Sequence, residues 1–254
     1  MSSSQAPPTL LSGPGYMIQG IKLLTGRGLR RFILIPLIIN LIIFILLSYF
    51  ILQLFGDFNA WIWGYLPEWL SFLAYLLWAL LFILFLIVYG YSFTLLTNVI
   101  AAPFYGMLAS KIEAELTGKP PANEPLQQMI PRTMRREMTK IGYFILYGSV
   151  VFFGLMLISW IPLVNITTPF LGILWSRWVM AIQYVDYPAD NHQIPFTELR
   201  QRLGSQRWAS TGLGGCILLG SMIPVINIFV APVAVAASTL YWIELASGSS
   251  QQIS

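Results

Sequence analysis

The hydrophobic positions of this chain form long blocks without charge. Residues 32–55 and 69–107 contain no Asp, Glu, Lys or Arg. About 20 consecutive apolar residues cross a hydrocarbon core of about 30 Å, so each block predicts a transmembrane helix. The second block, at about 39 residues, is too long for one helix perpendicular to the bilayer and must tilt or extend beyond it.

Two further hydrophobic blocks, residues 141–185 and 211–243, are each interrupted near the middle by a similar eight-residue motif. Proline cannot continue a helix without losing a backbone hydrogen bond, and Asn is a common turn residue, so both blocks read as helical hairpins and as an internal repeat. The arm 211–223 reaches only about 20 Å, which predicts partial penetration of the bilayer. The arms of 141–185 are longer, and full crossing stays open for them. The two interrupting motifs are Ser159-Trp160-Ile161-Pro162-Leu163-Val164-Asn165-Ile166 and Ser221-Met222-Ile223-Pro224-Val225-Ile226-Asn227-Ile228.

Asn165 and Asn227 lie at the two predicted hairpin tips. An amide without a hydrogen-bond partner is costly inside the membrane. One hypothesis is therefore that both side chains are hydrogen-bonded inside the protein or face a water-filled cavity. The other hypothesis is that each Asn caps its own helix.

The segment 109–140 is polar and basic. Its first part extends the second block and is ended by Gly118 and two prolines. A basic helix follows, and its cations share one face, which suits an anionic membrane surface or reflects only the positive-inside rule. That rule places both ends of the first helix pair in the cytoplasm, because residues 56–68 between them carry no Lys or Arg. The charged residues are Lys111, Glu113 and Glu115, then Arg132, Arg135, Arg136 and Lys140.

The composition agrees with a membrane class, since 57% of the 254 residues are hydrophobic and only 9% are charged. We therefore predict an all-α integral membrane protein with two long transmembrane helices and two partly penetrating hairpins, forming one domain over residues 16–254 after a disordered tail at 1–15. The net charge of +4 flanks apolar segments and faces lipid headgroups, so we expect no nucleic-acid partner. Cys216 is the only cysteine, which excludes an internal disulfide.

Few residues of the predicted membrane domain are candidates for metal binding, catalysis or a functional charge. Asp186, Asp190 and His192 lie within seven residues and would suit a divalent metal, and hence an intramembrane metal enzyme, although the same residues make an ordinary turn. Arg177 lies inside an apolar arm, where a charge is a functional candidate by default. It would otherwise reach headgroups or pair between subunits.

The segment Thr25-Gly26-Arg27-Gly28-Leu29-Arg30-Arg31 is the strongest site candidate. Two glycines permit a tight turn, and a helix starting just after Gly28 would direct its free N–H groups and its positive dipole end at that turn. Arg30 and Arg31 add guanidinium groups that bind two oxygens of sulfate or phosphate at once. Topogenic positive charge is the simpler alternative.

Several motifs occur in order along nearly the whole chain. They are Gly28-Leu29-Arg30-Arg31-Phe32, Ala101-Ala102-Pro103-Phe104, Leu116-Thr117-Gly118, Asp186-Tyr187-Pro188 with Asp190-Asn191-His192, and Met222-Ile223-Pro224. The Asp-Tyr-Pro-x-Asp-Asn-His run is the most specific. Taken together, these motifs resemble the bacterial sulfate permease family CysZ, to which eukaryotic proteins of the endoplasmic reticulum related to the etoposide-induced protein 2.4 also belong.

The resemblance implies a channel-like sulfate uptake protein of the bacterial inner membrane that supplies sulfate assimilation and cysteine biosynthesis, with an oligomeric assembly and no cofactor. It places sulfate at Gly28, Leu29 and Arg30, with Arg31 beside them. Candidates for the ion pathway are Asn40, Asn98, Glu113 and Arg177. Glu115 stands where relatives can carry a basic residue, so an acid–base pair there is not carried over.

The chain has no glycine-rich nucleotide loop ending in Lys-Ser or Lys-Thr, so we expect ATP-independent transport. A channel and a proton-coupled carrier using His192 and Glu113 both remain open, as does the choice among sulfate, sulfite and other oxyanions. Two spanning helices cannot enclose a polar route for a divalent anion, which favours a homo-oligomer in membrane lipid. The alternative function is a membrane-interaction or membrane-shaping protein that conducts nothing.

Overall fold

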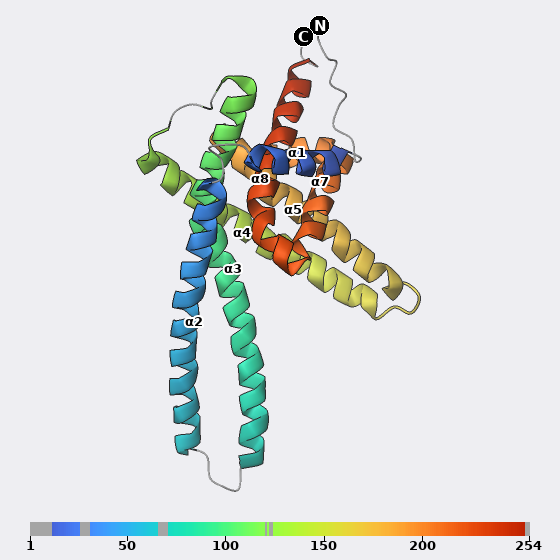
Figure 1. The fold of residues 1–254 in the computed structure, drawn as a ribbon. Coiled ribbons are helices and arrows are strands. Elements are labelled where there is room, and N and C mark those ends of the chain that lie inside the picture. Colours follow the sequence, from blue (N-terminus) through green and yellow to red (C-terminus); the bar gives the residue numbers. More distant parts are fainter. Residues whose placement is uncertain (1–11, 26–30, 66–70, 120, 122–123, 252–254) are drawn as a thin grey trace. The chain divides into compact units, whose positions relative to one another are not determined.

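The computed structural model describes residues 12–25, 31–65, 71–119, 121 and 124–251, and these residues form helices and turns without any strand (Figure 1). The prediction of an all-α protein is confirmed. The helices are α1 (Ser12–Thr25), α2 (Arg31–Tyr65), α3 (Ser71–Thr117), α4 (Leu126–Ser159), the 3-10 turn η2 (Asn165–Thr167), α5 (Thr168–Asn191), α6 (Phe196–Ser205), α7 (Arg207–Ser221) and α8 (Pro224–Gln251).

The chain divides into two compact units. One is Ile35–Ala101, and the other combines Met1–Leu34 with Ala102–Ser254, whereas the sequence suggested one domain over 16–254. Helix α1 begins at Ser12, inside the segment 1–15 assigned to a tail, and residues 1–11 lie outside the described part of the chain.

The unit Ile35–Ala101 is a hairpin of α2 and α3, held together by aromatic side chains. Phe55 of α2 contacts three rings of α3 at centroid distances of 5.1 to 5.8 Å in edge-to-face arrangements. Ser48 and Tyr89 share a hydrogen bond of 2.9 Å between their hydroxyl groups. Edge-to-face packing suits the ring quadrupoles, so these contacts set the register of the two helices.

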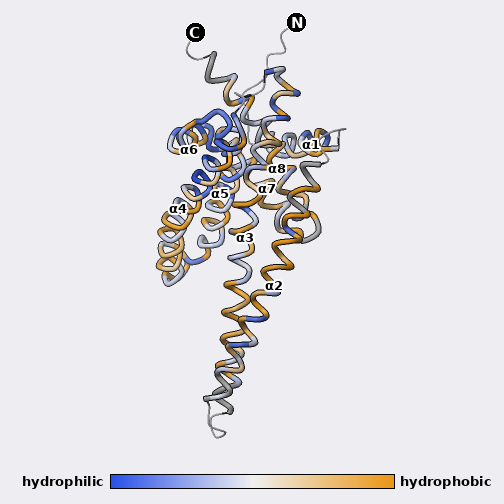
Figure 2. The backbone as a smooth tube through the Cα atoms, turned by 90° about the vertical axis from the view of Figure 1, so that its left-hand side faces the viewer, coloured by the Kyte–Doolittle hydropathy of each residue, from blue (hydrophilic) through white to orange (hydrophobic). Residues whose placement is uncertain are grey.

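Most residues along this hairpin are hydrophobic (Figure 2). Large hydrophobic side chains such as Leu52 and Tyr91 are 70% and 72% exposed. Spans long and apolar enough to cross a membrane cover Ile38–Phe58 and Tyr75–Thr117, so a long apolar helix is present in each of the two predicted blocks. The second span continues to Thr117 as one helix, and Gly118 then ends it with a φ of +68°.

The other unit packs α5 against α4, α7 and α8, and α1 against α7 and α8. Its core contains aliphatic and small residues of α5 and α7 together with Tyr241 of α8. Gly214 allows the closest approach: a Cβ there would lie 1.9 Å from the carbonyl oxygen of Arg177. The backbones of α5 and α7 are therefore in direct contact, which any larger residue would prevent.

Both predicted hairpins are present. Helices α4 and α5 are joined through residues 160–167, where Pro162 lies in the turn and Leu163 has a φ of +68°, and α7 and α8 are joined at residues 222–223 (Figure 1). Pro224 is the first residue of α8, a position at which its missing N–H costs nothing. Helix α4 and the span Phe229–Ser247 of α8 are also long and apolar enough to cross a membrane.

The boundary expected at residue 141 is absent. Leu126–Ser159 is one continuous helix of 34 residues, so the basic helix and the first hairpin arm are the same element. No proline follows Pro131 within α4, and isolated glycines are tolerated inside a helix, so nothing in the sequence forces a break there.

Two of the hypotheses for the tip asparagines, burial inside the protein and capping of a helix, are wrong, whereas placement in a wet cavity stays a prediction. Asn165 and Asn227 are both exposed, the first opening η2 after Val164 and the second lying inside the first turns of α8. Neither residue is a helix cap or lies inside the protein core, because each falls on the outer side of its turn.

Candidate functional site

The most polar part of the described chain is buried between α4 and α5. Lys140 is fully buried, with its Nζ 2.5 Å from Oε1 of Glu137 and 3.2 Å from Oδ2 of Asp186. The same ammonium lies 4.5 Å from the centre of the Tyr187 ring. A buried charge is tolerated only when it is paired, and this lysine is held by two carboxylates and an aromatic face.

Two arginines of α4 extend this cluster along the helix. Arg136 contacts Oδ1 of Asp186 through Nε at 2.8 Å and Nη2 at 2.7 Å. One turn earlier, Arg132 reaches Asp190 at 2.5 Å and Glu124 at 2.7 Å. Burial raises the pKa of Asp190, an effect that Arg132 opposes. Thr133 completes the contacts by donating to Oδ2 of Asp190 at 3.1 Å.

The basic face predicted on this helix is therefore an internal one. Arg132, Arg136 and Lys140 all point at acidic residues of the same unit, and only Arg135 of the four is exposed. A membrane-surface role for the face is wrong for the three paired cations. The i, i+4 and i+8 spacing places them in a row that matches the carboxylates of α5.

A second ionic contact joins the end of α3 to the end of α5. His192 Nε2 and Glu113 Oε1 are 2.7 Å apart, and the hydrogen bond with Glu113 raises the pKa of His192 above its ordinary value of 6.5, against the opposing effect of burial. Oε2 of Glu113 is buried and has no hydrogen-bond partner among the described residues. Asn191 fixes the same junction by donating to the carbonyl of Gly106 at 2.8 Å.

The Asp186–His192 run forms the last turns of α5 and the residue that caps this helix, as the interpretation of the run as a helix end expects. Asp186 and Asp190 pair with cations, and His192 pairs with Glu113. The described residues contain no group of three His, Cys, Asp or Glu placed to hold a metal ion. In this arrangement the three side chains are ion-pair partners that join α5 to α4 and to α3.

The other pathway candidates lie in both units. Arg177 on α5 is half-buried and donates through Nε to the carbonyl oxygen of Thr211 at 3.0 Å, so it ties α5 to α7. Asn40 and Asn98 belong to the α2–α3 hairpin and are both half-buried. Oδ1 of Asn40 is buried without a hydrogen-bond partner in the described part of the chain.

The predicted anion site falls mostly outside the described residues, which omit Gly28, Leu29 and Arg30. Arg31 is the first residue of α2. The helix start expected just after Gly28 lies outside the described residues and stays a prediction.

Comparison with known proteins places the chain. Residues 16–232 match the family described as "Sulfate transporter CysZ/Etoposide-induced protein 2.4". The chain belongs to this family. The sulfate transporter CysZ of Pseudomonas fluorescens (strain Pf0-1) is 46% identical over 241 residues, 93% of this chain and 95% of the relative. That of Pseudomonas aeruginosa (strain LESB58) is 44% identical over 237 residues, 92% and 95%. That of Salmonella typhimurium (strain LT2) is 40% identical over 251 residues, 96% of both chains.

Membership of the CysZ family confirms the resemblance seen in the sequence. The family description names transporters, so the enzyme hypothesis for Asp186, Asp190 and His192 is set aside. The residue that sequence reasoning missed is Glu137, which is 2% exposed in the centre of the cluster. Its spacing of three residues before Lys140 was the available signal, because such a pair shares one helix face.

Proposed function

We propose that this protein carries sulfate across the bacterial inner membrane, independently of ATP, and so supplies sulfate assimilation and cysteine biosynthesis. The observation that carries the proposal is the similarity to sulfate transporters over more than nine tenths of the chain. The four helices long and apolar enough to cross a membrane agree with it.

We place the sulfate-binding site at Gly28, Leu29, Arg30 and Arg31. Helix α2, whose described part begins at Arg31, supports this assignment, because the N-terminus of a helix attracts anions. Two guanidinium groups and free backbone N–H groups together supply the donors that a tetrahedral dianion accepts. Leu29 adds an apolar side chain that would limit competing water.

The ion pathway in this proposal involves Asn40, Asn98, Glu113 and Arg177. Asn40 and Glu113 each have a buried oxygen without a partner among the described residues, and such atoms suit a hydrated route. The Glu113–His192 contact also offers a proton site, so both a channel and a proton-coupled carrier are consistent with it. Arg177 contributes a positive charge to an otherwise apolar arm.

We propose further that the two hairpins enter the bilayer without spanning it. Helix α7 has 15 residues and therefore measures about 22 Å, less than the core of about 30 Å. The tips are apolar and open, with Trp160 at 83% and Leu163 at 88% exposure in one hairpin and Met222 at 69% in the other. The ionic cluster lies at the opposite end of the α4–α5 hairpin from its tip, which favours a polar base at the membrane surface.

A homo-oligomer completes the proposal. The α2–α3 hairpin exposes apolar side chains nearly all round, so a single copy offers no closed polar route. A dianion in hydrocarbon would be prohibitively costly, and several copies around a wet axis would remove that cost.

Radiolabelled sulfate uptake into proteoliposomes of the full-length protein tests transport directly. Uptake should require the protein, follow the sulfate gradient without ATP and compete with sulfite to a measurable extent. Proteoliposomes that stay tight to sulfate while the protein deforms their membranes would instead favour the non-conducting, membrane-shaping function.

A further inference from the structure

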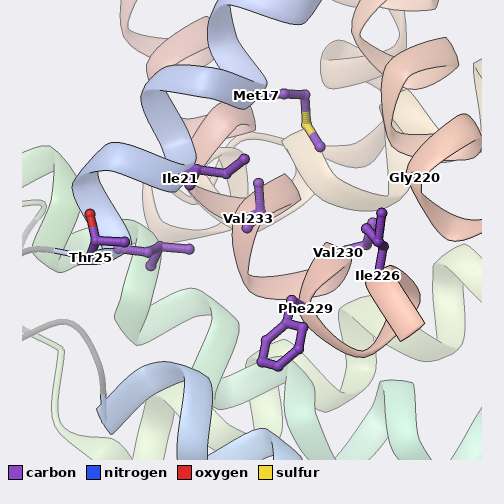
Figure 3. A pocket seen from close by; sticks show the side chains of 9 residues that line it. Met17, Ile21, Thr25, Gly220, Ile226, Phe229, Val230 and Val233 are labelled. Carbon is purple, nitrogen blue, oxygen red and sulfur yellow. The ribbon is translucent and has the colours of Figure 1, made fainter. Parts of the chain in front are cut away.

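An apolar cavity of about 320 Å³ lies between α1 and the hairpin of α7 and α8 (Figure 3). Its walls are side chains of Met17, Ile21 and Leu24 from α1 and of Ile226, Phe229 and Val233 from α8, with Gly220 of α7 at one side. The volume lies at the lower end of the 300–1,000 Å³ typical of small-molecule sites. The cavity belongs to one compact unit, so its shape is set by helices that pack on one another.

The cavity begins where the close contact between α1 and α8 ends. At Gly20 the helices touch, since a Cβ there would lie 3.0 Å from the carbonyl oxygen of Val233. Tyr16 also donates a hydrogen bond to Glu244, which fixes the first half of α1 on α8. Beyond Gly20 the side chains of Ile21 and Leu24 border open space (Figure 3). Because α1 is anchored at both Tyr16 and Gly20, it cannot move inward to close the gap.

The lining decides what can occupy this space. No polar atom of the lining residues borders the cavity, so water would find no hydrogen-bond partners there. An empty cavity of this size would forfeit the dispersion contacts of its walls. The surroundings are apolar too, because Ile18 of α1, Leu219 of α7 and Ile223 of the turn between α7 and α8 are exposed at 54%, 65% and 48%. The hydrocarbon of the bilayer is the abundant apolar material at such a surface.

A lysine lies beside the cavity in the sequence of α1. Lys22 follows Ile21 in the last turns of α1 and is exposed. A lysine can lay its stem along an apolar surface and leave its ammonium among headgroups, where it attracts anionic phosphate. We propose that the cavity binds one acyl chain of an anionic phospholipid, with the phosphate of that lipid at Lys22. The binding does not depend on sulfate transport.

The test uses full-length protein in phosphatidylcholine liposomes that contain a small fraction of phosphatidylglycerol with a photoreactive diazirine in its acyl tail. After illumination, digestion and mass spectrometry should find the label concentrated on Met17, Ile21 and Val233. Ile21→Trp fills the cavity and should lower labelling of Val233 at least about tenfold. Ile18→Trp is the matched control, because Ile18 lies on the same helix with similar exposure, 54% against 49%, and does not line the cavity.

Further arms separate the alternatives. Val233→Phe fills the space from the other wall and should reproduce the loss, read at Met17, if Ile21→Trp does not fold. Lys22→Gln should lower labelling by phosphatidylglycerol but not by a photoreactive phosphatidylcholine. With benzoylphenylalanine in place of Phe229, an adduct with lipid supports the proposal. Label spread evenly over exposed apolar residues, or an adduct of that side chain with a second copy of the chain, would overturn it.

Discussion

Lys140 on α4 and Asp186 on α5 form an ion pair of 3.2 Å in which neither side chain is more than 1% exposed. Replacing Lys140 with Met should destabilise the protein by about 3 kcal/mol, because Glu137 would stay buried without a cation and Asp186 would keep only Arg136 as its partner. Thermal unfolding in detergent, followed by fluorescence-detected size exclusion, measures the loss. Arg135→Met is the control on the same helix, where exposure limits the expected change to about 0.5 kcal/mol. Equal melting of the two variants would contradict the role given to Lys140.

Gly214 should not tolerate even a methyl group. Its Cβ would meet two backbone groups of α5, the Arg177 carbonyl at 1.9 Å and the Ala181 nitrogen at 2.8 Å, so Gly214→Ala should cost about 3 kcal/mol through forced separation of α5 and α7. Gly142→Ala is the counterpart, since a Cβ at Gly142 meets nothing within 4 Å. That change should stabilise α4 by about 0.5–1 kcal/mol. Opposite shifts in melting temperature are the expected result.

The double substitution of Arg30 and Arg31 by Ala should abolish sulfate binding by the purified protein. Both guanidinium groups supply paired donors to the dianion in the proposed site, and neither is required for the ionic cluster of α4 and α5. Isothermal titration with sulfate measures the affinity, and size exclusion verifies that fold and oligomer survive. An unchanged affinity would refute the site, while sulfate flux without measurable binding would move it elsewhere in the chain.

The Glu113–His192 contact predicts a pH dependence of stability. The pKa of His192 is raised above 6.5 in the folded protein, so the folded state favours the protonated imidazole. The stabilisation is therefore complete below about pH 6.5 and is lost as the pH rises through the folded pKa. Partial exposure of His192 keeps the effect small. Melting temperatures of the wild type should fall relative to those of His192→Gln between pH 6 and pH 8, because the variant lacks the titrating imidazole.

Glu113→Gln is the second arm of that experiment. It removes the negative charge that favours the imidazolium and should flatten the same pH profile. A wild-type profile that runs parallel to both variants would exclude a titrating contact at this junction.

The ionic cluster of α4 and α5 shows a limit of reasoning from sequence alone. The candidate cation row on α4 was visible from its spacing, but its partners lie some fifty positions away on α5, as the separation of 50 residues between Arg136 and Asp186 shows. Spacing reports which side chains share a helix face, and it carries no information on which helix lies opposite. The same limit made Asp186, Asp190 and His192 resemble a metal site.

The sequence by itself determined the all-α class, the two long apolar helices, both helical hairpins and the family, because these follow from apolar run length, helix-breaking residues and motif order. Only the tertiary structure decided that the basic face of α4 points inward, that Gly214 brings α5 and α7 into backbone contact and that α1 leaves a cavity beside α8. Helix length and apolar pattern are local properties of the chain, whereas ion pairing, close approach and cavity shape depend on which elements pack together.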